Sequence, residues 1–162
     1  MKIGAKMPLE EGKAAPAFTL ESTEGGTVAL KNLKGKTVVL YFYPKDDTSG
    51  CTAEACSFRD SYADFAAAGA VILGVSPDDL KSHSKFKAKY NLPFTLLADA
   101  DHAVAEKYGV WKEKSMYGRK YMGVERTTFI INAAGKIAKI FPKVKVPGHH
   151  AEVLEALKGI TG

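Results

Sequence analysis

Two short, uninterrupted runs of apolar and β-branched residues constrain the fold of this chain more than any other feature. They are residues 37–43 and 70–75, and neither shows the alternation of a half-exposed strand. Such runs are typical of strands that are buried on both faces of a sheet. The segment between them, residues 52–68, has a helical pattern that ends at Gly69. Because a helix between two buried strands is a parallel crossover, these segments predict a sheet covered by helices.

The remaining segments extend this core to an N-terminal hairpin, a β-α-β-α-β-α series and a closing β-β-α unit. We expect strands at residues 17–20, 27–30, 94–98, 127–131 and 137–141, and helices at 77–90, 101–108 and 148–159. Ser76 is predicted to cap the helix that Pro77 begins. Residues 110–126 are interpreted as a loop. The order predicts an α/β thioredoxin-like fold, with a central mixed sheet flanked by helices and an N-terminal β-hairpin.

Length and composition are those of an ordinary globular domain. The 162 residues are 46% hydrophobic and 25% charged, and we expect a single domain over residues 1–162 with a lead-in segment at 1–16. No apolar run approaches the ~20 residues that span a bilayer. The first eight residues lack the apolar stretch of a signal peptide. The expected location is therefore cytoplasmic, without a membrane partner.

Positive charge gathers in the last third of the chain. Residues 106–162 hold 11 basic and 5 acidic side chains, whereas residues 1–105 hold 12 and 13. One interpretation is a solvated basic face, and another is a docking surface for an acidic partner or anion. No motif supports nucleic-acid binding.

The chemistry of the chain is expected at Cys51, where the strand at 37–43 has ended and a helix begins. The first helical turn offers unpaired N–H groups and a partial positive charge, and both favour a thiolate over a thiol. A free cysteine, with its usual pKa near ~8.5, is only about 3% thiolate at neutral pH. A helix terminus typically contributes only about 0.3–1 kcal/mol, so a nearby Arg, Lys or protonated His is also expected.

The second cysteine, Cys56, follows five positions after Cys51, and the chain has no others. In a reducing cytosol such a close pair is more often redox-active or metal-binding than structural. In a regular helix the two Cα atoms would lie roughly 8.7 Å apart, whereas a disulfide needs about 4.4–6.8 Å. The pair can therefore form a disulfide only if the first turn and a half of the helix unwinds.

The segment around Cys51 also resembles a known family. Pro44, Thr48 and Cys51, in the pattern Pro-x-x-x-Thr-x-x-Cys, match the active-site signature of the peroxiredoxins. The second cysteine five positions on resembles the bacterioferritin comigratory protein, or Q-type, branch of that family. Shorter matches lie at residues 38–44, 91–94, 108–111 and 126–130. The resemblance covers nearly the whole chain from about Gly12 onward.

The resemblance implies a thiol peroxidase that reduces hydrogen peroxide and organic hydroperoxides to water and alcohols and requires no metal or other cofactor. Cys51 matches the peroxidatic cysteine, which attacks the peroxide and becomes a sulfenic acid. Cys56 matches the resolving cysteine, which condenses with that sulfenic acid to an intramolecular disulfide. Thioredoxin or a similar dithiol protein is the implied reductant, and the branch suggests a monomer.

The same resemblance implies roles for four further residues. Pro44 matches the proline that walls the substrate pocket, and Thr48 matches the hydroxyl that hydrogen-bonds the thiolate and the bound peroxide. Arg126 matches the cation that Cys51 requires. Glu54 resembles the acid that holds such an arginine in place and, with the other three, lines the substrate site.

Several alternatives stay open at this point. The chain could be a thioredoxin-like disulfide reductase that uses the same two cysteines, or a basic binding module with inert cysteines. Thr48 could act only as a helix cap, and Glu54 and Arg59 could be ordinary charges on a helix surface. We interpret Trp111 as an anchor and His149 with its neighbour His150 as a solvated pair. A zinc site built from two cysteines and two histidines is disfavoured, because adjacent histidines chelate one ion poorly.

Overall fold

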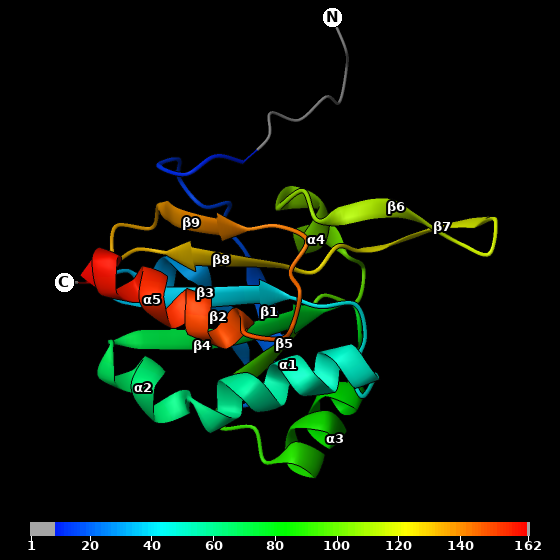
Figure 1. Cartoon of the computed structure of the whole chain (residues 1–162), viewed down its shortest axis with the longest axis horizontal. Coiled ribbons are helices and arrows are strands. Elements are labelled where there is room, and N and C mark those ends of the chain that lie inside the picture. The colour runs from blue at the N-terminus through cyan, green and yellow to red at the C-terminus, as the bar shows by residue number, and fades with distance from the viewer. Residues whose placement is uncertain (1–8, 162) are drawn as a thin grey trace, which may run out of the picture.

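The structure is a computed structural model that describes residues 9–161, so the first eight residues of the expected lead-in lie outside the described part. Its centre is a seven-stranded mixed sheet (Figure 1). In spatial order the strands are β2 (Thr27–Ala29), β1 (Thr19–Ser22), β5 (Thr95–Ala98), β4 (Ala70–Ser76), β3 (Thr37–Phe42), β8 (Thr127–Ile131) and β9 (Ile137–Phe141). The pairs β3–β4 and β4–β5 are parallel and the others antiparallel. The predicted mixed sheet and N-terminal hairpin are confirmed.

Strand β3 supplies both halves of the core, which explains why its sequence lacks alternation. All six of its residues are buried. Val38, Leu40 and Phe42 point into one apolar cluster, and Val39 and Tyr41 point into the other on the opposite face. Because side chains alternate across a strand, a strand buried on both faces needs apolar residues at every position.

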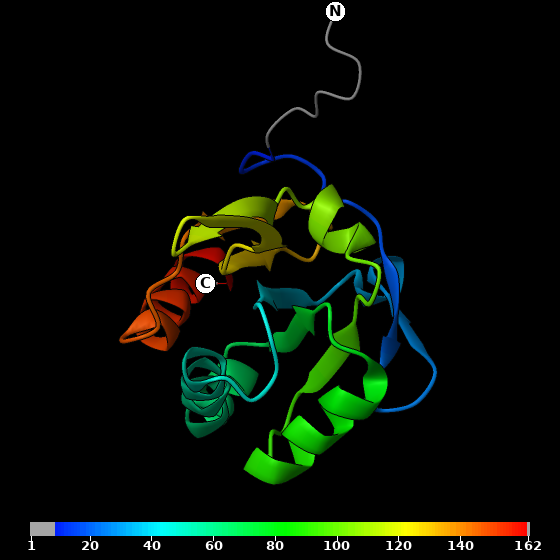
Figure 2. The same ribbon diagram turned by 90° about the vertical axis from the view of Figure 1, so that its right-hand side faces the viewer.

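Helices cover the two faces unequally (Figure 2). One cluster joins the sheet to four helices, which are α1 (Ser49–Asp60), α2 (Tyr62–Ala67), α3 (Leu80–Tyr90) and α5 (His149–Thr161). The other lies under α4 (Ala103–Lys107) and the short 3-10 helix η1 (Leu30–Leu33). None of the helices within residues 9–161 is long and apolar enough to cross a membrane.

The predicted start of α3 is wrong by three residues. Ser76 ends β4, and the helix begins at Leu80 behind Asp79. The Asp79 side chain accepts a hydrogen bond from the backbone N–H of Ser82 (2.8 Å), so it is the N-cap residue. Aspartate caps a helix as well as serine does, and Ser76 is held in the sheet by the pairing of β4 with β5.

Residues 110–126 are not the expected loop but contain a second, two-stranded sheet. Strands β6 (Trp111–Met116) and β7 (Arg119–Val124) form an antiparallel hairpin that projects from the body of the molecule (Figure 1). Its turn residues Tyr117 and Gly118 both have positive φ, at 53° and 76°. Two such residues are typical of the tight turn that matches the twist of a hairpin.

Candidate active site

Helix α1 begins directly behind the loop that follows β3, and Cys51 lies in its first turn. Thr48 is the N-cap residue, with φ −93° and ψ 157°, so Cys51 is the third helical residue. The first N–H groups of a helix have no partner in a preceding turn, and the helix dipole is positive there. Only 1% of the Cys51 surface is exposed. The sulfur therefore lies at a helix N-terminus, as the sequence predicts, in a site that largely excludes water.

Arg126 reaches Cys51 through the pairing of β3 with β8. Phe42, the last residue of β3, lies opposite Thr127, the first residue of β8. Arg126 is one residue before this pair and so lies at the end of the sheet where the chain leaves β3 toward α1. Its Nη2 donates a hydrogen bond to Cys51 Sγ over 3.4 Å. The cation expected beside the sulfur is thus supplied by a residue that is distant in the sequence.

Glu54 holds the other end of the Arg126 guanidinium. Its carboxylate is fully buried and accepts a hydrogen bond from Arg126 Nη1 over 2.6 Å. Burial raises the pKa of Glu54 to about 7, although the charge and hydrogen bond of Arg126 act in the opposite direction. Burial lowers the pKa of Arg126, but the charges of Glu54 and Cys51 outweigh it and the net shift is upward. The guanidinium therefore stays positive and bridges the carboxylate to the sulfur.

The interpretation as an ordinary charge on a helix surface has a different outcome for Glu54 and for Arg59. It is wrong for Glu54, which is buried against Arg126. Arg59 instead donates to the Asp60 carboxylate (3.0 Å) and to the carbonyl oxygen of Tyr90 (2.8 Å), and the structure does not bring it to Cys51. It ties α1 to the end of α3.

Cys56 is half-buried, and both cysteines are free thiols. Helix α1 runs without interruption through the two positions. An intact helix keeps their Cα atoms farther apart than a disulfide allows. A bond between them therefore requires a local change in α1.

Pro44 and Thr48 flank the loop between β3 and α1. Pro44 is half-buried. Thr48 is exposed, and its hydroxyl donates to the carbonyl oxygen of Lys45 over 2.9 Å instead of capping the helix. A hydroxyl has a single hydrogen to donate, so the lone pairs of Thr48 Oγ1 are the part that can meet a ligand.

The interpretation of His149 and His150 as a solvated pair is wrong for His149. This residue is 1% exposed, and its ring lies within hydrogen-bond distance of Thr128 Oγ1 (2.7 Å) and Glu152 Oε1 (2.6 Å). Burial lowers its pKa. The signal was present in the sequence, because His149, Val153 and Leu157 recur every four residues and so share one face of α5.

Sequence reasoning also missed the polar side chains that hold the loop before Cys51. Asp46 is buried and lies within hydrogen-bond distance of His83 on α3 (2.7 Å). Its neighbour Asp47 accepts hydrogen bonds from Lys89 (2.8 Å) and Tyr90 (2.9 Å) of the same helix. The spacing of His83, three residues before Phe86, could have indicated that it lies on the buried face of α3.

This arrangement is suited to a reactive sulfur. A helix N-terminus and a guanidinium both favour negative charge on Cys51. The same donors can stabilise negative charge that develops on an oxygen bound next to the sulfur. A second thiol lies farther along the same helix, so an oxidised Cys51 has a partner within the chain.

The chain is similar to proteins of one known family. The model of the AhpC/TSA family matches residues 12–140. The chain is 53% identical over 155 residues to peroxiredoxin Bcp of Bacillus subtilis, a match that covers 96% of this chain and 99% of that protein. It is 45% identical over 151 residues to peroxiredoxin Bcp of Escherichia coli, covering 93% and 97%.

A solved structure of the bacterioferritin comigratory protein of Xanthomonas campestris has the same fold. It superimposes with a TM-score of 0.88 at 40% identity and covers 94% of this chain and 100% of that one. The structure is described as a trapped intermediate or ligand complex that gives insight into alkyl peroxide reduction by that protein.

Proposed function

The chain belongs to the AhpC/TSA family, in its Bcp or peroxiredoxin Q branch, and is a thiol peroxidase; we propose that Cys51 is its peroxidatic cysteine and Cys56 its resolving cysteine. The observation that carries this assignment is the hydrogen bond from Arg126 to the sulfur of Cys51 at the start of α1. Cys56 has neither a helix N-terminus nor this guanidinium beside it.

In the first step the Cys51 thiolate attacks the terminal oxygen of a hydroperoxide. The S–O bond forms as the O–O bond breaks, so the sulfur is oxidised to a sulfenic acid and the leaving oxygen takes up a proton to become water or an alcohol. Arg126 stabilises the charge on the leaving oxygen. Thr48 accepts the hydrogen of the bound peroxide at its free lone pairs, and Pro44 keeps water from the sulfur.

In the second step the Cys56 thiol attacks the Cys51 sulfenic acid and releases water, which leaves a disulfide between the two residues. An external dithiol protein of the thioredoxin class then reduces this disulfide by thiol exchange and is itself oxidised. The substrates we propose are hydrogen peroxide and organic hydroperoxides, and the alkyl peroxide reduction ascribed to the Xanthomonas protein supports the organic class. We propose that the enzyme acts as a cytoplasmic monomer in antioxidant defence.

Rapid mixing of the fully reduced protein with peroxide, in the absence of any reductant, tests the assignment. One equivalent of peroxide should be consumed, and intact mass should then fall by about two hydrogens. The Cys56→Ser variant should consume peroxide and gain about one oxygen, whereas Cys51→Ser should consume none. A disulfide reductase would consume little peroxide in any form, and a binding module with inert cysteines would consume none.

A further inference from the structure

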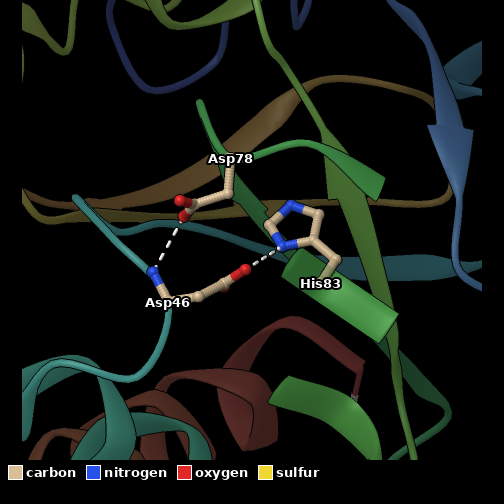
Figure 3. Close-up of side chains that lie close together, drawn as sticks. All are labelled: Asp46, Asp78 and His83. Atoms are coloured by element: carbon tan, nitrogen blue, oxygen red, sulfur yellow. Dashed lines mark hydrogen bonds and ion pairs between the residues drawn. The ribbon is translucent and has the colours of Figure 1, made fainter. Parts of the chain in front are cut away.

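A buried polar cluster lies beside the loop that leads to Cys51, and the proposed chemistry does not use it. It consists of Asp46 in that loop, Asp78 after β4 and His83 on α3 (Figure 3). One ligand-type atom of each lies within 4.8 Å of the others. His83 has no exposed surface and Asp46 is 7% exposed.

The nearest neighbours of both ring nitrogens of His83 are oxygens that accept hydrogen bonds. Nε2 lies 2.8 Å from the carbonyl oxygen of Leu97, and Nδ1 lies 2.7 Å from Asp46 Oδ2. The Tyr43 hydroxyl lies farther away, 3.4 Å from Nδ1, and donates its single hydrogen to Asp46 instead. Each nitrogen therefore needs a hydrogen of its own, and an imidazole that carries both is a cation. The second carboxylate, that of Asp78, adds negative charge on the same side.

The partners of Asp46 point to the same protonation state. Besides His83, its carboxylate accepts hydrogen bonds from the Tyr43 hydroxyl (2.6 Å) and the Ser82 hydroxyl (2.8 Å). A carboxylate that accepts three hydrogen bonds is favoured over the acid. Burial raises the pKa of Tyr43 well above its ordinary value, so this side chain stays a neutral donor. The geometry of the two side chains, with His83 Nδ1 2.7 Å from Asp46 Oδ2, is therefore that of a buried ion pair.

The cluster has the ligand types of a metal site, but its atoms are already engaged. Asp78 Oδ2 accepts from the Asp46 backbone N–H (2.8 Å) and from the Ser76 hydroxyl (2.6 Å). The Asp46 oxygens accept three hydrogen bonds, and both nitrogens of His83 are donors. A metal ion would have to displace this network, so the ion pair explains the cluster better.

Asp46 lies between Pro44 and Thr48, in the middle of the segment that places Cys51. Tyr43, the residue after β3, is bonded to the same carboxylate. Thr48 is in turn tied to the carbonyl oxygen of Lys45, the residue before Asp46. The position of the Asp46 backbone therefore fixes both ends of the proposed peroxide pocket relative to α3.

We propose that His83 is a positioning residue for the peroxide reaction: its imidazolium holds Asp46 and so holds the loop of Pro44 and Thr48 over Cys51. The inference rests on the proposed role of Cys51. A displacement of about 1 Å at a reacting group can reduce a rate by as much as about 100-fold. Loss of this ion pair should therefore slow the reaction of Cys51 with peroxide by about tenfold or more.

Nitrogen NMR of histidine-labelled wild-type protein at pH 7 tests the protonation state without any substitution. We expect the two ring nitrogens of His83 to give the nearly equal shifts of an imidazolium. A neutral ring, with one nitrogen free of hydrogen, would overturn the proposal. This measurement decides the question even if the variants fail to fold.

The kinetic test compares His83→Gln, Asp46→Asn and the double variant in rapid mixing with hydrogen peroxide. Both single variants should be slowed, and the double variant should be no slower than either, because the two residues act as a unit. The rate at which iodoacetamide alkylates Cys51 shows whether a slower variant has lost the positioning of the loop or has a loosened fold. A loosened fold would expose the buried sulfur and speed alkylation, whereas loss of positioning should leave it within about twofold.

His102→Gln is the matched control, since His102 pairs with Glu106 over 3.0 Å at an exposed site. Its rate constant should equal that of the wild type. Folded His83→Gln and Asp46→Asn variants that react as fast as the wild type would contradict the proposal. A wild type that does not consume peroxide would instead contradict the function of Cys51.

Discussion

Gly50 sets how closely the Arg126 guanidinium can approach Cys51. A Cβ at this position would lie 3.1 Å from Arg126 Nη2 and 3.9 Å from Cζ. The guanidinium is also held by its hydrogen bond to Glu54, which restricts its movement away from an added Cβ. The absence of a side chain at position 50 is therefore part of the geometry of the site.

We predict that Gly50→Ala slows peroxide consumption and leaves the fold intact or more stable. The added methyl group displaces the cation from the sulfur, whereas alanine in place of glycine within a helix favours folding by up to ~1 kcal/mol. Stopped-flow rates and urea unfolding measure the two effects. Gly159→Ala in α5 is the control, because a Cβ there meets nothing within 4 Å. An unchanged peroxide rate in Gly50→Ala would contradict this account.

Glu54 should make the stability of the protein depend on pH. Its pKa is about 7 in the folded protein, against an ordinary value of 4.5. Between these values the folded protein binds the proton and the unfolded chain does not. The contribution of Glu54 to stability therefore falls as pH rises from about 4.5 to about 7, by up to roughly 3 kcal/mol.

Glu54→Gln should remove this dependence. Relative to the wild type, the variant should gain free energy of unfolding between pH 5 and pH 8, whatever its stability at pH 5. Urea denaturation at both values measures the difference. Glu21→Gln, an exposed substitution on β1, should follow the wild type. Parallel curves for Glu54→Gln and the wild type would show that the burial of this carboxylate does not govern its ionisation.

The role of a single residue could be predicted from the sequence only where a local pattern indicated what surrounds its side chain. The need for a cation beside Cys51 followed from the weakness of a helix dipole, but its identification as Arg126 depended on family resemblance. Only the register of β3 against β8 brings that residue to the sulfur. The interpretation of His149 as solvated failed because adjacent histidines at a helix start indicate a polar surface, whereas the four-residue spacing to Val153 places this ring in the core.

At the scale of elements, α1 must be both well packed and able to open. Cys51, Ala55 and Phe58 are buried on one side of the helix. Phe58 packs its ring against Tyr41, Phe65 and other aromatic residues, with centroids 4.9 Å and 5.5 Å away for these two. The end of α1 is therefore anchored at Phe58, and the change that a disulfide requires should fall on the turns before it.

Amide exchange should report this change. We predict that residues 49–58 lose protection when the protein is oxidised by one equivalent of peroxide, because the disulfide cannot form across an intact helix. Helix α3 should keep its protection and serves as the internal reference. Cys56→Ser, which cannot form the bond, should keep the protection of the reduced protein. Equal protection of α1 in both redox states would contradict either the disulfide or the helix assignment.

The strands and helices that were predicted well from the sequence are those whose side chains pack in the core. The β6–β7 hairpin was missed because most of its residues are exposed, so burial imposes no period of two on them. Its turn at Tyr117 and Gly118 also lacks the Asn-Gly or Asp-Gly pair that marks such hairpins. The start of α3 was misplaced because two residues suited to capping, Ser76 and Asp79, lie close together.

At the scale of the whole molecule, the β6–β7 hairpin exposes part of the positive charge that gathers in the last third of the sequence. Lys112, Arg119 and Lys120 are exposed on it, and so are four large apolar side chains, Met116, Tyr117, Tyr121 and Met122. The hairpin also lies near the active site. Burial and the charge of Arg126 lower the pKa of Lys114, whereas the charge of Cys51 raises it.

We therefore predict that salt slows the reduction of the oxidised enzyme by an acidic dithiol protein. The Debye length shrinks from about 10 Å at 0.1 M salt to about 3 Å at 1 M, so steering by these cations should fade and the rate should drop several-fold. Reduction by the small neutral dithiol dithiothreitol should not respond. Arg119→Glu with Lys120→Glu should slow only the protein reductant. The control is Lys31→Glu with Lys36→Glu, which makes the same change in net charge on η1 and the segment that follows it. If this variant lost as much of the rate of reduction by the protein, overall charge and not the hairpin would guide the partner.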